Sequence, residues 1–73
     1  MFQRFHLIRG LTALENVVVP LTLRNVRERT ARQRALEVLD EVGLADYVHA
    51  HPNCLSTGQC QRVALARALV GDP

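Results

Sequence analysis

Ser56-Thr57-Gly58-Gln59, which precede a long apolar run, are the residues of this sequence best suited to chemistry. Ser56 with Gln59 three positions later has the pattern of a helix capping box. The first N–H groups of a helix have no intrahelical acceptor, and the aligned peptide dipoles place about half a positive charge there. Gly58 lacks the Cβ that would hinder the approach of an anion. The stretch predicts either a phosphate-binding helix start or a plain helix cap, of which the cap is the commoner.

A second group of reactive side chains lies around the same segment. His49, His51, Cys54 and Cys60 have the spacing H-x-H-x2-C-x5-C. No standard zinc site has this spacing, and Cys60 falls inside the predicted helix, which sets its direction. We expect ordinary loop residues here, reduced cysteines and no metal.

The elements that position the candidate site are predicted to be helices. Thr12 with Glu15 forms a capping box before an apolar stripe, and Pro20 is expected to end or kink that helix. Asn25 with Glu28 forms a second, weaker cap pattern. The helix that follows carries an apolar stripe with Gly43 placed to end it; the stripe consists of Ala31, Ala35, Val38, Leu39 and Val42.

The sequence predicts different structures for the two ends of the chain. Residues 1–9 suggest a strand end that passes into a loop, through Phe2, Phe5, Leu7 and Ile8. The last helix, which begins at the Ser56 cap, has apolar side chains in nearly all directions around its axis. A helix of that kind belongs inside a larger protein, so we expect further structure to cover it.

Length and composition bound the class of protein. At 73 residues and 48% apolar the chain is at most one small globular domain, and its formal charge is +2. All nine basic residues are arginine. The apolar runs are too short to cross a bilayer and no signal-peptide pattern begins the chain, so we expect a cytosolic location.

The segment "LSTGQCQRVALARALVGDP" resembles the signature segment of ATP-binding cassette (ABC) transporter ATPases, whose usual form is L-S-G-G-Q followed by Q-R-V/L-A-x-A-R-A-L. Upstream, "FQRFHLIRGLTALENVVVPL" resembles the Q-loop of that family, with Gln3 on the Q-loop glutamine, and the start of its helical subdomain. The implied fold is mostly α: the helical subdomain and signature helix of an incomplete P-loop NTPase α/β nucleotide-binding domain. The implied division is residues 1–10 for the Q-loop region, 11–53 for the helical subdomain, and 54–73 for the signature motif and helix.

This resemblance implies a function for the candidate residues. Ser56, Gly58 and Gln59 would complete the ATP site of an opposing ATPase subunit in trans, and Gln3 would sense the nucleotide and its Mg²⁺. The partners would be a second ATPase subunit and the transmembrane permease, on the inner face of the cell membrane, with ATP hydrolysis coupled to transport. Pro20-Leu21 soon after Glu15-Asn16-Val17 is similar to the lipoprotein-releasing and macrolide-export branch.

The sequence departs from the family pattern in two ways. Thr57 stands where the first glycine is usual, which should weaken the ATP contact without abolishing it; Cys54 and Cys60 replace usual polar residues that bind no phosphate. The 73 residues also contain no G-x-x-x-x-G-K-[ST] motif, no lysine at all, and no apolar strand ending in Asp-Glu. This chain alone is therefore expected to be inactive, with no catalytic residue of its own.

The sequence is also compatible with two other functions. A small Arg-rich module could bind nucleic acid or an acidic protein through the arginines between positions 24 and 34, but few aromatic residues accompany them and a solvated helix face is the commoner explanation, so no nucleic acid is expected. A natural 73-residue product that docks on an intact ATPase or permease has no support in the sequence, and its apolar last helix would favour aggregation.

Overall fold

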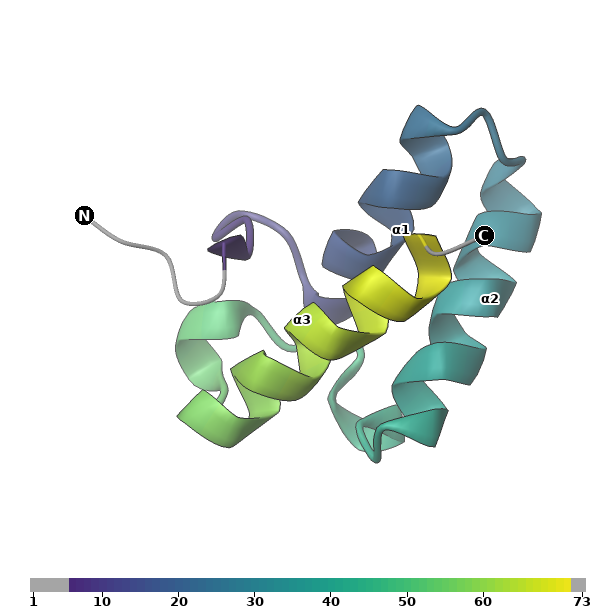
Figure 1. The fold of residues 1–73 in the computed structure, drawn as a ribbon. Coiled ribbons are helices and arrows are strands. Elements are labelled where there is room, and N and C mark those ends of the chain that lie inside the picture. Colours follow the sequence, from purple (N-terminus) through teal and green to yellow (C-terminus); the bar gives the residue numbers. More distant parts are fainter. Residues whose placement is uncertain (1–5, 72–73) are drawn as a thin grey trace.

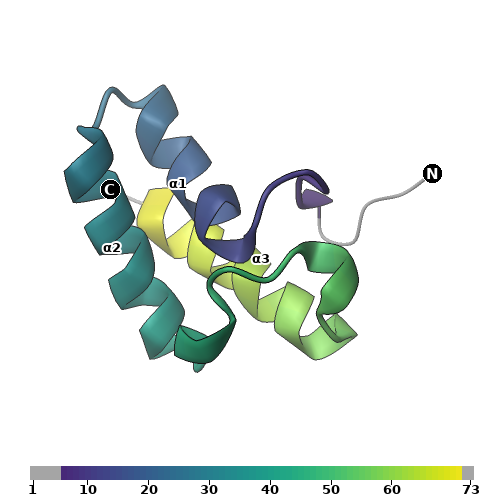
Figure 2. The same cartoon turned by 180° about the vertical axis from the view of Figure 1, so that it is seen from behind.

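The structure, a computed structural model, describes residues 6–71 as three helices that pack on one another (Figure 1). They are α1 (Ala13–Leu23), α2 (Glu28–Glu41) and α3 (Thr57–Gly71), with the short 3₁₀ turns η2 (Ala45–Tyr47) and η3 (Pro52–Cys54) between α2 and α3. α1 and α2 run antiparallel, and α3 lies diagonally across them in both views (Figure 2). Residues 6–71 contain no strand.

The expected strand end near the N-terminus is not found in the described residues. Phe2 and Phe5 lie outside them, and Leu7 and Ile8 belong to an irregular segment that leads into α1. Leu7 nevertheless lies in the core, with 1% of its surface exposed.

The first helix begins at the predicted capping box. The Glu15 amide donates to Thr12 Oγ1 at 3.2 Å, and the Thr12 amide donates to Glu15 Oε1 at 2.9 Å. The hydrogen bond from the Thr12 amide, with smaller contributions from nearby charges, lowers the pKa of the Glu15 carboxyl below its ordinary 4.5. The carboxylate is therefore part of the folded helix start rather than a free surface charge.

Glu15→Gln should change how stability responds to acid. A carboxyl whose pKa is lower in the folded state stabilises the fold fully above its unfolded pKa, and this contribution is lost as the pH falls through the lowered folded value. Glutamine keeps the capping box without titrating. We expect the wild type to lose more stability than Glu15→Gln when the pH falls below about 4.5, measured by urea denaturation at several pH values. Parallel losses in the two proteins would contradict the prediction.

The end of α1 bears on two sequence-based predictions and contradicts the one for Asn25. Pro20 does not end the helix, which continues to Leu23. Proline inside a helix cannot donate an N–H bond and also crowds the carbonyl four residues earlier, yet α1 continues beyond it to Leu23. Asn25 does not cap α2, whose N-cap is Arg27 without a side-chain bond. Instead Asn25 has a left-handed φ of 64° and closes α1.

The bonds that close α1 are those of a Schellman motif. The Asn25 amide donates to the Thr22 carbonyl at 3.0 Å, and the Val26 amide donates to the Leu21 carbonyl at 3.0 Å. Asparagine tolerates the left-handed conformation better than most residues, so it serves at a helix end as well as at a helix start. Asn25 therefore does cap a helix, but it caps the end of α1 and not the start of α2.

The second helix follows its predicted stripe and ends where expected. Ala31, Ala35, Val38 and Leu39 are buried. Gly43 has φ 83°, and the Gly43 and Leu44 amides donate to the Asp40 and Leu39 carbonyls at 3.0 and 2.8 Å. This second Schellman motif turns Leu44 into the core, where 1% of its surface is exposed.

The third helix buries only one of its faces in the described structure. The buried side chains are Cys60, Val63, Ala66 and Val70. On the other side Leu65 and Leu69 are 51% and 45% exposed. We expected α3 to have more apolar surface than the rest of the chain can bury. The packing of residues 6–71 is consistent with this expectation. None of the helices in this range is long and apolar enough to cross a membrane.

Candidate functional site

The candidate site is the exposed first turn of α3. The Gln59 amide donates to Ser56 Oγ at 3.0 Å and the Ser56 amide donates to Gln59 Oε1 at 2.9 Å, so the predicted capping box is confirmed. Because Ser56 Oγ is the acceptor in this bond, its own proton remains available to a further acceptor. Ser56 and Gly58 are exposed, and Gln59 is partly buried.

Gly58 is not required by the packing of this chain. A Cβ built at Gly58 would meet no described atom closer than Ser56 Oγ, at 4.0 Å. Its backbone also has no positive φ, so a larger residue could adopt the conformation. Glycine near a helix start costs stability relative to alanine. The packing therefore does not require a glycine at this position. The open space on the side where a Cβ would lie, next to the Ser56 hydroxyl, leaves room for a ligand to approach the backbone.

Two buried side chains hold this turn on the core. Leu55, directly before the cap, is 6% exposed, and Cys60 is fully buried. The Cys60 thiol donates to the Pro52 carbonyl in η3 at 3.3 Å. Cys60 lies inside α3 with its thiol directed to η3. Residues 6–71 contain no group of three or more histidine, cysteine or acidic side chains that could hold a metal. The turn can bind an anion through N–H groups and a hydroxyl.

Gln3, the other predicted site residue, lies outside the described residues. His6, the first described residue, is held against α3, because Arg67 Nη1 donates to its carbonyl at 3.0 Å. His6 has a left-handed φ of 63°. The structure therefore brings Ser56, Gly58 and Gln59 together in one turn, and ties His6 to the same helix.

A buried asparagine fixes the rest of that segment. Asn16 is fully buried, and its Oδ1 accepts a bond from the Ile8 amide at 2.7 Å. Its Nδ2 donates to the carbonyls of Ile8, Leu11 and Thr12 at 3.1, 3.2 and 3.0 Å. One side chain of α1 thus satisfies four backbone groups of the loop 8–12.

Sequence reasoning did not assign a role to Asn16 or Arg67. A polar residue on the inward side of an otherwise apolar helix, between Ala13 and Val17, was the available signal for Asn16. Arg67 had no signal besides its place in the signature motif, since its backbone acceptor lies 61 residues away.

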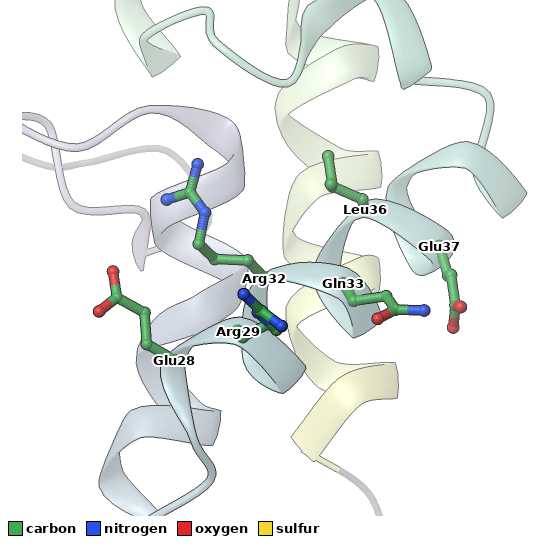
Figure 3. A pocket seen from close by; sticks show the side chains of 6 residues that line it. All are labelled: Glu28, Arg29, Arg32, Gln33, Leu36 and Glu37. Carbon is green, nitrogen blue, oxygen red and sulfur yellow. The ribbon is translucent and has the colours of Figure 1, made fainter.

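The arginine-rich stretch forms a mixed-charge surface on α2. An open hollow there is lined by Glu28, Arg29, Arg32, Gln33, Leu36 and Glu37. All six residues come from α2 and are exposed (Figure 3). Glu28 and Glu37 flank the two arginines, so the surface has no single sign of charge of the kind that phosphate backbones require. A nucleic-acid role is not favoured.

Comparisons with known proteins agree with the signature segment. The profile of the family described as "ABC transporter" matches residues 1–73. An uncharacterized ABC transporter ATP-binding protein, YvrO of Bacillus subtilis (strain 168), is 53% identical over all 73 residues, which span 32% of its length. The methionine import ATP-binding protein MetN of Streptomyces griseus is 51% identical over the whole chain, which covers 20% of it.

A solved structure matches as well. It is a dimeric, post-hydrolysis state of the ATP-binding cassette MJ0796 bound to ADP and Pi, with a TM-score of 0.86 and 47% sequence identity. The match covers 99% of this chain and 33% of that one. The chain thus spans a third or less of the length of these relatives.

Proposed function

Since the chain belongs to the ABC transporter family and corresponds to part of its ATP-binding subunit, we propose that the first turn of α3 binds the terminal phosphate of ATP held by an opposing subunit. The single observation that carries this proposal is Gly58, a glycine with open space before it that the packing of the chain does not demand. The exposed Ser56 hydroxyl beside it supplies a second donor.

The roles of the residues follow from this geometry. Ser56 donates its hydroxyl proton to a phosphate oxygen while its Oγ keeps the Gln59 amide capped. Gly58 allows the phosphate to reach the backbone N–H groups at the positive end of the helix dipole. Gln59 holds the turn through the Ser56 amide. For Gln3, which lies outside the described residues, the role of nucleotide and Mg²⁺ sensor is proposed from the resemblance to the Q-loop alone.

The remaining parts of the chain take supporting roles in this proposal. Residues 1–10 form the Q-loop region, residues 11–53 the helical subdomain, and residues 54–73 the signature motif and helix. ATP and Mg²⁺ are bound between two ATPase subunits, hydrolysis is carried out by the whole protein, and the helical subdomain contacts a permease at the inner face of the membrane. The MJ0796 cassette, solved as a dimer with ADP and Pi, supports the dimeric arrangement.

The branch within the family is proposed from sequence alone. Pro20-Leu21 after Glu15-Asn16-Val17 favours the lipoprotein-releasing and macrolide-export branch. Two of the relatives compared by sequence differ in what their names state: MetN is a methionine importer, and YvrO has no stated substrate. Transport assays with permeases of both kinds would separate the branches.

Substitution of Ser56 tests the proposed contact in a complete protein. We define the hybrid cassette as MJ0796 with residues 1–73 of this chain in place of its matching third. Asp and Asn cap helices about as well as Ser, so Ser56→Asp and Ser56→Asn should both keep the stability of the fold. Only aspartate places a negative charge against the phosphate. We expect ATP-driven dimerisation to weaken by at least about 100-fold in Ser56→Asp and by about tenfold in Ser56→Asn.

Sedimentation with a slowly hydrolysed ATP analogue measures this dimerisation, and circular dichroism confirms the helices. The unsubstituted hybrid cassette is the reference and must dimerise when the analogue is added. Equal dimerisation in Ser56→Asp and the reference would refute the contact between α3 and the nucleotide.

A further inference from the structure

We infer that Arg62 is a positioning residue, whose guanidinium holds the first turn of α3 in a fixed orientation relative to the end of α2. This inference deepens the proposed function and rests on it, because the first turn of α3 is the part of the chain proposed to bind phosphate. Arg62 does not touch the nucleotide in this proposal. It acts through the negative end of another helix.

The guanidinium of Arg62 lies at the C-terminal end of α2. A Cβ built on Gly43, the residue that follows the last turn of α2, would lie 3.5 Å from Arg62 Nη1. A Cα–Cβ bond is about 1.5 Å long, so this nitrogen lies within about 5 Å of the Gly43 Cα. The side chain of Arg62 therefore reaches from α3 across to the end of its neighbour.

The end of α2 favours a cation supplied from outside the helix. The aligned peptide dipoles place about half a negative charge at the C-terminal end of a helix. The last turn of α2 contains no basic residue, and Asp40 and Glu41 add negative charge to it. Arg62 brings a positive charge to this end from α3, so its position is electrostatically favourable.

Arg62 and Gly58 belong to the same face of α3. They are four residues apart, which corresponds to about one turn and about 6 Å along the helix axis. The buried Cys60 and Val63 hold this part of α3 on the core, but apolar contacts are not directional. A rotation of α3 that takes the guanidinium away from the end of α2 also turns Gly58. The contact therefore fixes the direction in which the proposed phosphate-binding turn faces.

Arg62→Met in the hybrid cassette keeps an apolar side chain and removes the charge. We expect ATP-driven dimerisation to weaken by about three- to thirtyfold, the size of effect seen for residues that act on a site without contacting its ligand. The equilibrium constant for unfolding should rise about two- to fivefold, as for an exposed cation lost from a helix end. Arg62→Lys keeps the charge and should retain most of both properties. Arg34→Met, at an exposed arginine of α2, is the matched control and should leave dimerisation unchanged.

Gly43→Ala distinguishes positioning from a general loss of stability. Alanine is strained at this left-handed position, but its methyl group would be in ordinary contact with Arg62 Nη1 at 3.5 Å and would not displace it. We therefore expect Gly43→Ala to lose at least as much stability as Arg62→Met and yet to dimerise like the reference. Urea denaturation without nucleotide measures stability, and sedimentation with the slowly hydrolysed ATP analogue measures dimerisation.

Salt identifies the interaction that Arg62 makes. The guanidinium is exposed, so about 1 M NaCl should screen its attraction to the end of α2. The difference in stability between the reference and Arg62→Met should therefore shrink in salt. A difference that salt leaves unchanged would show that the side chain acts by packing, which would overturn the inference.

The outcomes separate this inference from the function on which it rests. If dimerisation depends on Ser56 but is equal in Arg62→Met and Gly43→Ala, the inference is overturned and the proposed function stands. If Arg62→Met weakens dimerisation without any change in stability in the absence of nucleotide, Arg62 acts on the nucleotide itself and the inference is overturned too. If the unsubstituted hybrid cassette folds but never responds to ATP, both are overturned.

Discussion

Gly58→Ala should stabilise the chain and at the same time weaken its binding to ATP in trans. A methyl group at this position meets no described atom closer than 4.0 Å and needs no unusual backbone conformation. Alanine in a helix is more favourable than glycine by up to about 1 kcal/mol. The same methyl group would occupy the space in front of the Ser56 hydroxyl, where the proposed phosphate must lie. We expect ATP-driven dimerisation of the hybrid cassette to weaken by on the order of tenfold or more, because backbone hydrogen bonds to a charged group are lost.

Gly43→Ala is the matched control for this substitution. Gly43 has φ 83°, in the left-handed region, so alanine there should destabilise the fold by about 1 kcal/mol or more. It is located at the end of α2 and should leave ATP-driven dimerisation of the folded protein unchanged. Urea denaturation and sedimentation measure the two effects separately. A Gly58→Ala protein that is destabilised like Gly43→Ala would mean that the fold itself requires the glycine.

These two glycines illustrate which structural features could be predicted from the sequence. Gly43 was assigned to a helix end because the apolar stripe of α2 stops there, and its two Schellman bonds confirm the assignment. The capping boxes at Thr12 and Ser56 were also predicted from the sequence and are confirmed by their hydrogen bonds. Each of these features depends on residues within three to five positions of one another, so its signal lies in a short stretch of sequence.

Features that depend on the choice between neighbouring elements were harder to assign. Asn25 suits either the end of one helix or the start of the next, and only its φ of 64° shows that it ends α1. Pro20 was expected to end or kink α1, and the helix, which packs against two others, does not end there but continues to Leu23. The residue type alone therefore left more than one structure open at both positions.

Long-range contacts were out of reach for a different reason. The bond from Arg67 to the His6 carbonyl joins residues 61 positions apart, and its acceptor is a backbone atom that carries no sequence signal. The apolar remainder of α3 was expected to exceed what the chain can cover, and in the described part of the chain Leu65 and Leu69 remain about half exposed. The pattern of apolar residues thus indicated which helix faces should make contacts, and the three-dimensional structure was needed to identify the partners of those contacts.

Asn16→Ala should be among the most destabilising single substitutions in this chain. It removes the oxygen that accepts a bond from the Ile8 amide, and the amide group that donates to three carbonyls of the loop 8–12. The Ile8 and Thr12 carbonyls keep the Leu11 and Asn16 amides as donors, so the largest losses fall on the Ile8 amide and the Leu11 carbonyl. Leaving a polar group that is shielded from water without its partner costs about 1–3 kcal/mol. We expect a loss of about 2–4 kcal/mol in the free energy of unfolding, a large part of the roughly 4–11 kcal/mol available to a protein of this size. Asn53→Ala, at an exposed asparagine, is the control and should change stability by less than about 0.5 kcal/mol.

Asn16→Asp tests which half of the side chain matters. Aspartate keeps an acceptor for the Ile8 amide but puts an oxygen where the amide group donates to the carbonyls of Ile8, Leu11 and Thr12. Its buried charge would face carbonyl oxygens, so this variant should be at least as unstable as Asn16→Ala near neutral pH and recover in acid, where the carboxyl becomes a donor. Equal stability of Asn16→Asp and the wild type in urea at pH 7 would mean that the donor bonds do not hold the loop. The burial of Leu7 would then be its principal attachment to the helices.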